Sequence, residues 1–176
     1  MIQDKKPFCW APWVSLSYNA IRHGGSAEPC CEWRGNQLTP KNLFQGQVSD
    51  YLKSDWLKNI KQVMIDHDMS IISKTCEECI IEERVGNTSS RMDYHNNIET
   101  GEWSRDGIHF LDFRPGNTCN LKCRMCSPPN SSMIEEEQGL NLYSMDVSDI
   151  TTLDFSKIKV IKILGGEPSI DPKVSE

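Results

Sequence analysis

Residues 108–113 are Ile-His-Phe-Leu-Asp-Phe, and residues 160–166 are Val-Ile-Lys-Ile-Leu-Gly-Gly. Both are short, nearly continuous apolar runs that end in turn-forming residues, which is typical of strands buried in a parallel sheet. Between them, Ser132 precedes Glu135 by three residues, the spacing of a capping box at the start of a helix. A strand, a loop, a helix and a second strand in this order predict a βαβ unit of an α/β fold.

Three cysteines lie in the loop that follows the first of these strands, in the stretch Cys119-Asn-Leu-Lys-Cys123-Arg-Met-Cys126. Three thiolates within eight residues can surround one inorganic centre. A structural zinc ion needs four protein ligands, so Cys76, Cys79 or a histidine would have to complete such a site. Three unrelated thiols are the other alternative. A cubane 4Fe–4S cluster needs one outside ligand for each iron, so three cysteines leave one iron open to a substrate or cofactor.

The second strand ends in Gly165-Gly166-Glu167-Pro168. Two glycines after a parallel strand let a ligand approach the backbone, and the Glu167 carboxylate is an acceptor for an ammonium group. Taken alone, these four residues are more typical of a plain turn. Their position one βαβ unit after the three-cysteine loop favours a shared site.

This pair of motifs resembles the radical S-adenosylmethionine (SAM) superfamily. The resemblance implies a partial TIM-like (β/α)6 barrel, in which Cys119, Cys123 and Cys126 bind a 4Fe–4S cluster. It also implies that the amino and carboxylate groups of SAM chelate the fourth iron, with Gly165, Gly166, Glu167 and Pro168 lining the cofactor site. Met125 departs from the pattern, because the family usually has an aromatic residue there. The implied activity is that of a radical SAM enzyme, in which reductive cleavage of SAM gives a 5′-deoxyadenosyl radical that abstracts hydrogen from a substrate.

The residues before the βαβ unit predict a small α+β domain. Residues 13–18 alternate apolar and polar side chains like a strand, and a turn at residues 22–26 leads to a second short strand, giving a hairpin. Residues 34–46 are predicted to be loop. From Val48 to Met64 the apolar residues recur every three or four positions, which predicts one amphipathic helix. Residues 76–84 predict a turn and a short helix.

The polar, glycine-containing stretch 86–105 has few apolar residues, and we place the domain boundary there. The predicted domains are residues 1–105 and residues 106–176, the second being the first part of the barrel.

Four cysteines of the first domain form a second candidate site: Cys9, Cys30, Cys76 and Cys79. The spacing C-x15-G-x4-C followed by C-x2-C resembles the twitch module, a short relative of the SPASM domain that binds one auxiliary 4Fe–4S cluster. The stretch Phe8-Cys-Trp-Ala-Pro-Trp13 and the pair Ser90-Arg91 also resemble a radical SAM subgroup with this module at the N-terminus. Cys31 is the spare thiol or replaces Cys30 as a ligand. A structural zinc site with the same four cysteines is the alternative.

Composition limits the partners. The 176 residues carry a formal net charge of −6, which argues against nucleic acid or an anionic membrane as a partner. We find no apolar run long enough to span a membrane and no secretory signal. Eight cysteines without a signal predict a cytoplasmic, metal-binding protein rather than a disulfide-rich secreted one.

The superfamily resemblance implies two partners, a reductant such as flavodoxin or ferredoxin and a peptide or protein substrate. Arg91 and Arg114 are predicted to form surface salt bridges, with pairing to the SAM carboxylate or to a cluster as the alternative. Since the family resemblance implies a barrel with further strands, we expect residues 1–176 to be the N-terminal part of a longer protein or half of a split one, and to be poorly active or inactive alone. The alternative function is a non-catalytic, zinc-stabilised binding module.

Overall fold

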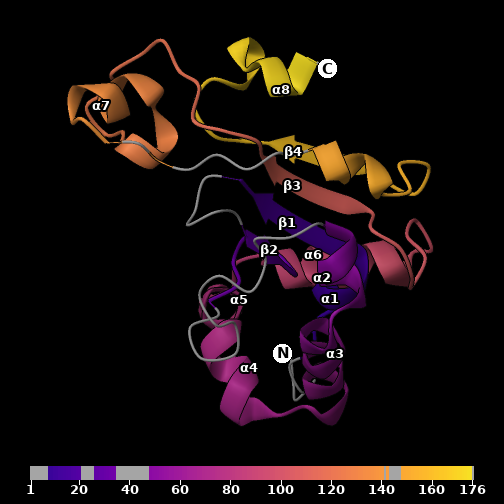
Figure 1. Cartoon of the computed structure of the whole chain (residues 1–176). Coiled ribbons are helices and arrows are strands. Elements are labelled where there is room, and N and C mark those ends of the chain that lie inside the picture. Colours follow the sequence, from indigo (N-terminus) through magenta and orange to yellow (C-terminus); the bar gives the residue numbers. More distant parts are fainter. Residues whose placement is uncertain (1–7, 21–25, 35–47, 141, 143–147, 176) are drawn as a thin grey trace.

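The computed structural model describes residues 8–20, 26–34, 48–140, 142 and 148–175. The predicted turn at residues 22–26 lies almost entirely, and the predicted loop at residues 34–46 very largely, outside these ranges. Within them the chain is a mixed α/β structure built on a four-stranded sheet with strand order β2-β1-β3-β4 (Figure 1).

The sheet joins the two halves of the chain. The strands are β1 (Ser15–Asn19), β2 (Ser26–Glu28), β3 (Phe110–Arg114) and β4 (Val160–Ile163). β1 and β2 are antiparallel, as the predicted hairpin requires, and β3 and β4 are parallel, as the predicted βαβ unit requires. β1 also pairs in parallel with β3, with Leu16 opposite Leu111. One sheet therefore crosses the predicted boundary at residue 105.

Helices cover both faces of the sheet. On one face, the side chains of Leu16, Tyr18, Leu111 and Phe113 pack against α2 (Val48–Lys53) and the short helix η2 (Ser148–Thr152). On the other face, α6 (Ser90–Glu99) contacts β1 and β3 through Tyr94. β1 is buried along its whole length because it has a neighbour on each side and a cover on each face. The residues of β4 are exposed, since it lies at the edge of the sheet among the described residues.

α3 (Asp55–Asp66), α4 (Met69–Thr75) and α5 (Glu77–Arg84) lie beyond the β1–β2 edge, whereas α7 and α8 lie beyond β4 (Figure 1). The short helix α1 (Ala11–Val14) leads directly into β1. The helices that follow β3 in the sequence include η1 (Pro128–Asn130), α7 (Ser132–Glu137), η3 (Pro168–Ile170) and α8 (Pro172–Ser175). No helix in the described part of the chain combines the length and apolar character needed to cross a bilayer.

Two sequence expectations, the single helix and the capping box, were wrong in detail. The helix predicted from Val48 to Met64 is two helices, because the Ser54 hydroxyl caps α3 by accepting from the Leu57 amide at 3.1 Å. The predicted boundary stretch contains α6, which the Ser89 side chain caps in the same way. The predicted capping box fails because the N-cap of α7 is Ser131 and has no side-chain cap, while the Ser132 hydroxyl bonds elsewhere.

Candidate functional site

The three-cysteine loop connects β3 to α7 and is tied at both ends. At its start the Ser132 amide donates to the Asn117 carbonyl at 2.7 Å. The Ser132 hydroxyl accepts from the Cys119 amide at 3.0 Å and donates to the Cys119 carbonyl at 3.1 Å. The Ser131 hydroxyl donates to the Leu121 carbonyl at 2.8 Å. The first residues of α7 therefore fix the backbone around Cys119.

The glycine turn after β4 packs directly on the residues that precede Cys119. The Glu167 amide donates to the Thr118 carbonyl at 2.8 Å. Gly166 has a φ of +50°, and a Cβ added to it would stand 2.2 Å from the Thr118 carbonyl oxygen. Only glycine permits that approach without movement of the backbone. The parallel pairing of β3 and β4 thus brings both sequence motifs to one end of the sheet.

The loop thiols are accessible to solvent. Cys123 is exposed, and Cys119 and Cys126 are partly exposed. The Leu121 amide donates to the Cys119 sulfur at 3.4 Å, and the Cys126 amide donates to the Cys123 carbonyl at 2.9 Å. Glu167 is half-buried and accepts from the Ser169 hydroxyl at 2.8 Å, while Pro168 begins η3. The loop therefore presents three thiols on an open surface, next to the backbone of the glycine turn.

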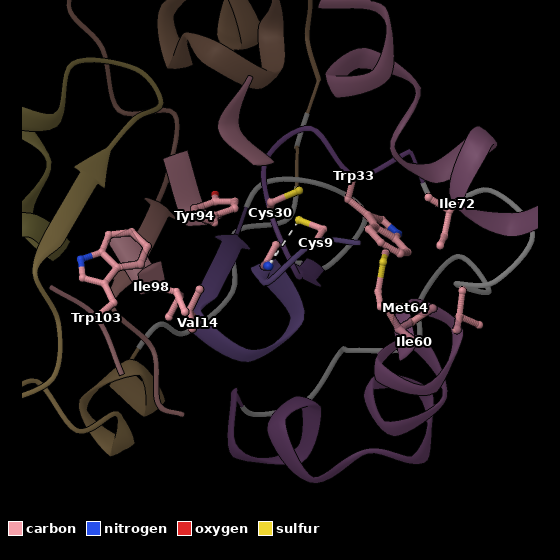
Figure 2. Packing of buried hydrophobic residues seen from close by; sticks show 12 residues of the cluster. Cys9, Val14, Cys30, Trp33, Ile60, Met64, Ile72, Tyr94, Ile98 and Trp103 are labelled. Carbon is pink, nitrogen blue, oxygen red and sulfur yellow. Dashed lines mark hydrogen bonds between the residues drawn. The ribbon is translucent and has the colours of Figure 1, made fainter. Parts of the chain in front are cut away.

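The four N-terminal cysteines come from three separate segments. Cys9 precedes α1, Cys30 follows β2, and Cys76 and Cys79 lie at the N-cap and in the first turn of α5. Cys9, Cys30 and Cys79 are buried and Cys76 is half-buried. Figure 2 shows the sulfur atoms of Cys9 and Cys30 side by side in an apolar cluster next to Tyr94. Folding thus collects thiols that are far apart in the sequence.

These thiols interact electrostatically. Burial raises the pKa of Cys9 far above its usual range, and charge on Cys76 and Cys79 raises it further. Burial, followed by charge on Cys9 and Cys76, raises the pKa of Cys30 in the same way. Burial is also the main reason why the pKa of Cys76 is raised to about 11. Each of the four thiols is therefore within electrostatic reach of at least one other.

Cys31 points to different neighbours. Burial, followed by the charges of Asp112 on β3 and Glu32, raises the pKa of Cys31 to about 11. The side chain of Lys162 on β4 opposes that effect. The main charged neighbours of Cys31 are therefore Asp112 and Glu32, whereas those of Cys30 are Cys9 and Cys76, with a smaller contribution from Cys31.

The donor chemistry of both thiol groups suits a metal centre bound by thiolates. In each group a backbone amide donates to a sulfur at 3.4 Å, from Leu121 to Cys119 and from Ala11 to Cys9. At Cys9 the bond from Ala11 lowers the pKa of the thiol, against the larger rise that burial causes. Within the described ranges, no three His, Cys, Asp or Glu side chains are gathered closely enough to hold a metal ion.

Sequence reasoning missed two features of these sites. Ser132 was assigned to a cap but instead bonds Cys119 through both its hydroxyl donor and its acceptor. Arg91 was expected in a surface salt bridge, yet its side chain is only 12% exposed and pairs with Glu83. Glu83 follows Cys76 and Cys79 at the spacing of one helix face, and this spacing was the signal that could have revealed the Arg91–Glu83 pair. Arg114 is partly exposed and pairs with buried Asp112 at 3.4 Å.

Comparisons of the chain with family models, with curated proteins and with solved structures found no match.

Proposed function

We propose that this protein is a radical SAM enzyme in which the three-cysteine loop binds the catalytic 4Fe–4S cluster. The observation that carries the proposal is the contact between the Gly166–Glu167 turn and Thr118, the residue before Cys119. A ligand held by the loop would lie beside the only carboxylate of the glycine turn. SAM binding requires one iron without a protein ligand and, next to it, a group that accepts a hydrogen bond from the ammonium of SAM, and this arrangement would supply both.

The chain's own residues would perform the binding and positioning. Cys119, Cys123 and Cys126 would hold the cluster, and Glu167 would accept from the amino group of SAM. Ser132 and the Gly166 turn fix the backbone on either side of these groups. When bound, the cluster and SAM supply a 5′-deoxyadenosyl radical that abstracts hydrogen from the substrate.

The finer fold assignment belongs to the same proposal. β3, α7 and β4 would be the first part of a (β/α)6 barrel, and the segment before them would be a twitch-like domain. Cys9, Cys30, Cys76 and Cys79 would bind an auxiliary 4Fe–4S cluster. Their shared burial and mutual electrostatic effects support Cys30 rather than Cys31 as the fourth ligand.

Partners remain part of the proposal as well. Twitch and SPASM relatives often modify peptides or proteins, so the substrate class proposed is a peptide or protein. The cluster would receive electrons from a small reductant such as flavodoxin or ferredoxin. The proposed location is the cytoplasm.

The test is anaerobic purification of the full-length protein, followed by iron and sulfide analysis and an assay for 5′-deoxyadenosine with dithionite and SAM. We expect a brown protein with about eight irons per chain for two cubane clusters. Replacing Cys119, Cys123 or Cys126 by Ala should abolish 5′-deoxyadenosine formation, whereas the matched variant Cys76→Ala should retain part of it. A colourless protein with about two zinc ions would refute the proposal and support a zinc-stabilised binding module.

A further inference from the structure

Arg91 is held in a partly buried ion pair rather than in an exposed one. Its Nε donates to Glu83 Oε1 at 2.9 Å, and its Nη2 donates to Glu83 Oε2. The exposed fractions of the two side chains are 12% and 17%. The Ser89 hydroxyl also donates to Glu83 Oε1, at 2.6 Å, and fixes the carboxylate from the other side. This bidentate arrangement gives the guanidinium one position.

Glu83 places that guanidinium on the cysteine side of α5. Cys76 stands at the N-cap, Cys79 follows three residues later, and Glu83 follows four residues after that. Residues at these intervals lie along one face of a helix. A side chain bound to Glu83 is therefore directed along the face that carries both thiols.

The charge of Arg91 reaches the thiols. It opposes the rise in the pKa of both Cys9 and Cys76 that burial causes, and at Cys76 its effect exceeds the opposite effect of Glu83. Burial alone would lower the pKa of Arg91, but Glu83, followed by Cys9 and Cys76, raises it above the usual value. The four-thiol site thus has a fixed positive neighbour.

A buried site of four thiolates requires such a neighbour. Four thiolates bring four negative charges, and a divalent metal ion or a 4Fe–4S core with charge +2 neutralises only half of them. The remaining negative charge is costly in a buried environment, and a nearby guanidinium offsets part of that cost.

We propose that Arg91 is a positioning residue that supplies the countercharge of the four-thiol site and raises the reduction potential of the group bound there. The inference rests on the proposed function for the auxiliary cluster. Glu83 has a double role, since it orients Arg91 and also weakens the positive field that the thiols experience. The two residues therefore have opposite effects on the potential.

The experiment uses full-length protein in which Cys119, Cys123 and Cys126 are replaced by Ala, so that only the auxiliary site binds metal. Iron and sulfide are counted first, and the reduction potential is then titrated by electron paramagnetic resonance. Arg91→Gln should lower the ratio of reduced to oxidised cluster at a fixed potential about tenfold, which equals about 59 mV for a one-electron couple. Arg91→Lys should stay close to the parent protein.

Glu83→Gln provides the opposite test, because it keeps Arg91 and removes its countercharge. We expect its potential to rise, and it decides the question if Arg91→Gln does not fold. The exposed Arg84 at the end of α5 is the matched control, and Arg84→Gln should change nothing. The inference would be overturned if iron-loaded Arg91→Gln had the reduction potential of the parent protein. It would also be overturned if the potential of Glu83→Gln were unchanged or lower. Either result would leave the auxiliary cluster itself established.

If the parent protein holds zinc instead of iron, the proposed auxiliary cluster fails and the countercharge is tested with zinc alone. Arg91→Gln should then lose zinc to a chelator at about tenfold lower chelator concentration than Arg91→Lys. Equal zinc retention in the two variants would overturn the inference.

Discussion

The Cα of Gly166 lies against the backbone of Thr118, so closely that a Cβ on residue 166 would stand 2.2 Å from the Thr118 carbonyl oxygen. The same added Cβ would lie 2.7 Å from the carbonyl carbon of Asn117 and 2.8 Å from that of Thr118. None of these atoms belongs to a flexible side chain. The contact therefore sets the distance between the glycine turn and the cysteine loop.

Gly166→Ala should destabilise the protein and displace the glycine turn. Overpacking against backbone costs about 1–3 kcal/mol, in addition to about 1 kcal/mol for a left-handed conformation in alanine. Gly139→Ala is the matched control, because Gly139 has a φ of +64° but nothing within 4 Å of an added Cβ. Thermal unfolding of the two variants measures the difference. Equal unfolding temperatures would show that the turn can move away from Thr118 at no cost.

Ser132→Ala should loosen the cysteine loop. The hydroxyl makes two hydrogen bonds to the backbone of Cys119, and one such bond contributes about 1 kcal/mol, or about a fivefold change in an equilibrium. We expect about fivefold easier loss of iron from the loop to a chelator. The exposed Ser156, whose hydroxyl donates to Asp154 two residues before it, provides the control variant Ser156→Ala. Identical iron retention in the two variants would contradict this role for Ser132.

The strands could be predicted locally but their assembly could not. Residues 108–113 and 160–164 are apolar enough to identify β3 and β4, and the alternation around Leu16 identifies β1. The parallel pairing of Leu16 with Leu111 joins segments far apart in the chain, and no local pattern specifies it. α6 was missed because Tyr94 and Ile98 are its only buried residues and the rest of its surface is polar.

The candidate site was predictable to a similar extent. Cysteine spacing and the double glycine located the loop and the turn in the sequence, and the turn was recognisable because a positive φ restricts residue type strongly. Ser132 and Arg91 were assigned other roles because a serine hydroxyl or a guanidinium finds its partner only after folding. Their partners, Cys119 and Glu83, lie on different elements from their own.

Cys30→Ala and Cys31→Ala should differ sharply, although the two residues are adjacent. Cys30 is buried beside Cys9 (Figure 2). Cys31 is half-exposed, and the charge of Asp112 acts on it. Cys30→Ala should remove the auxiliary metal group and about four irons per chain, while Cys31→Ala should keep the full iron content. Iron and sulfide analysis decides between them. The reverse result would identify Cys31 as the ligand.

Metal-free protein should lose stability at alkaline pH. Burial raises the pKa of Cys76 from 9.0 to about 11, and it raises the pKa of Cys9 and Cys30 as well. Because a folded thiol resists losing its proton, its contribution to stability is complete below pH 9 and is lost as the pH rises toward 11. Urea unfolding of the metal-free protein between pH 8 and 11 should therefore show a falling free energy of unfolding. The buried phenols of Tyr51 and Tyr94, whose pKa values are also raised, add to the fall above pH 10.

Metal binding should oppose this loss of stability at alkaline pH, because the thiols must lose their protons to act as ligands. Metal uptake should become stronger as the pH rises below the pKa of the thiols, and the loaded protein should lose less stability than the metal-free protein between pH 9 and 11. Cys76→Ala tests the assignment, since removing this thiol should flatten part of the decline in the metal-free protein. A metal-free protein whose stability stays constant to pH 11 would mean that these thiols ionise as easily when folded as when unfolded.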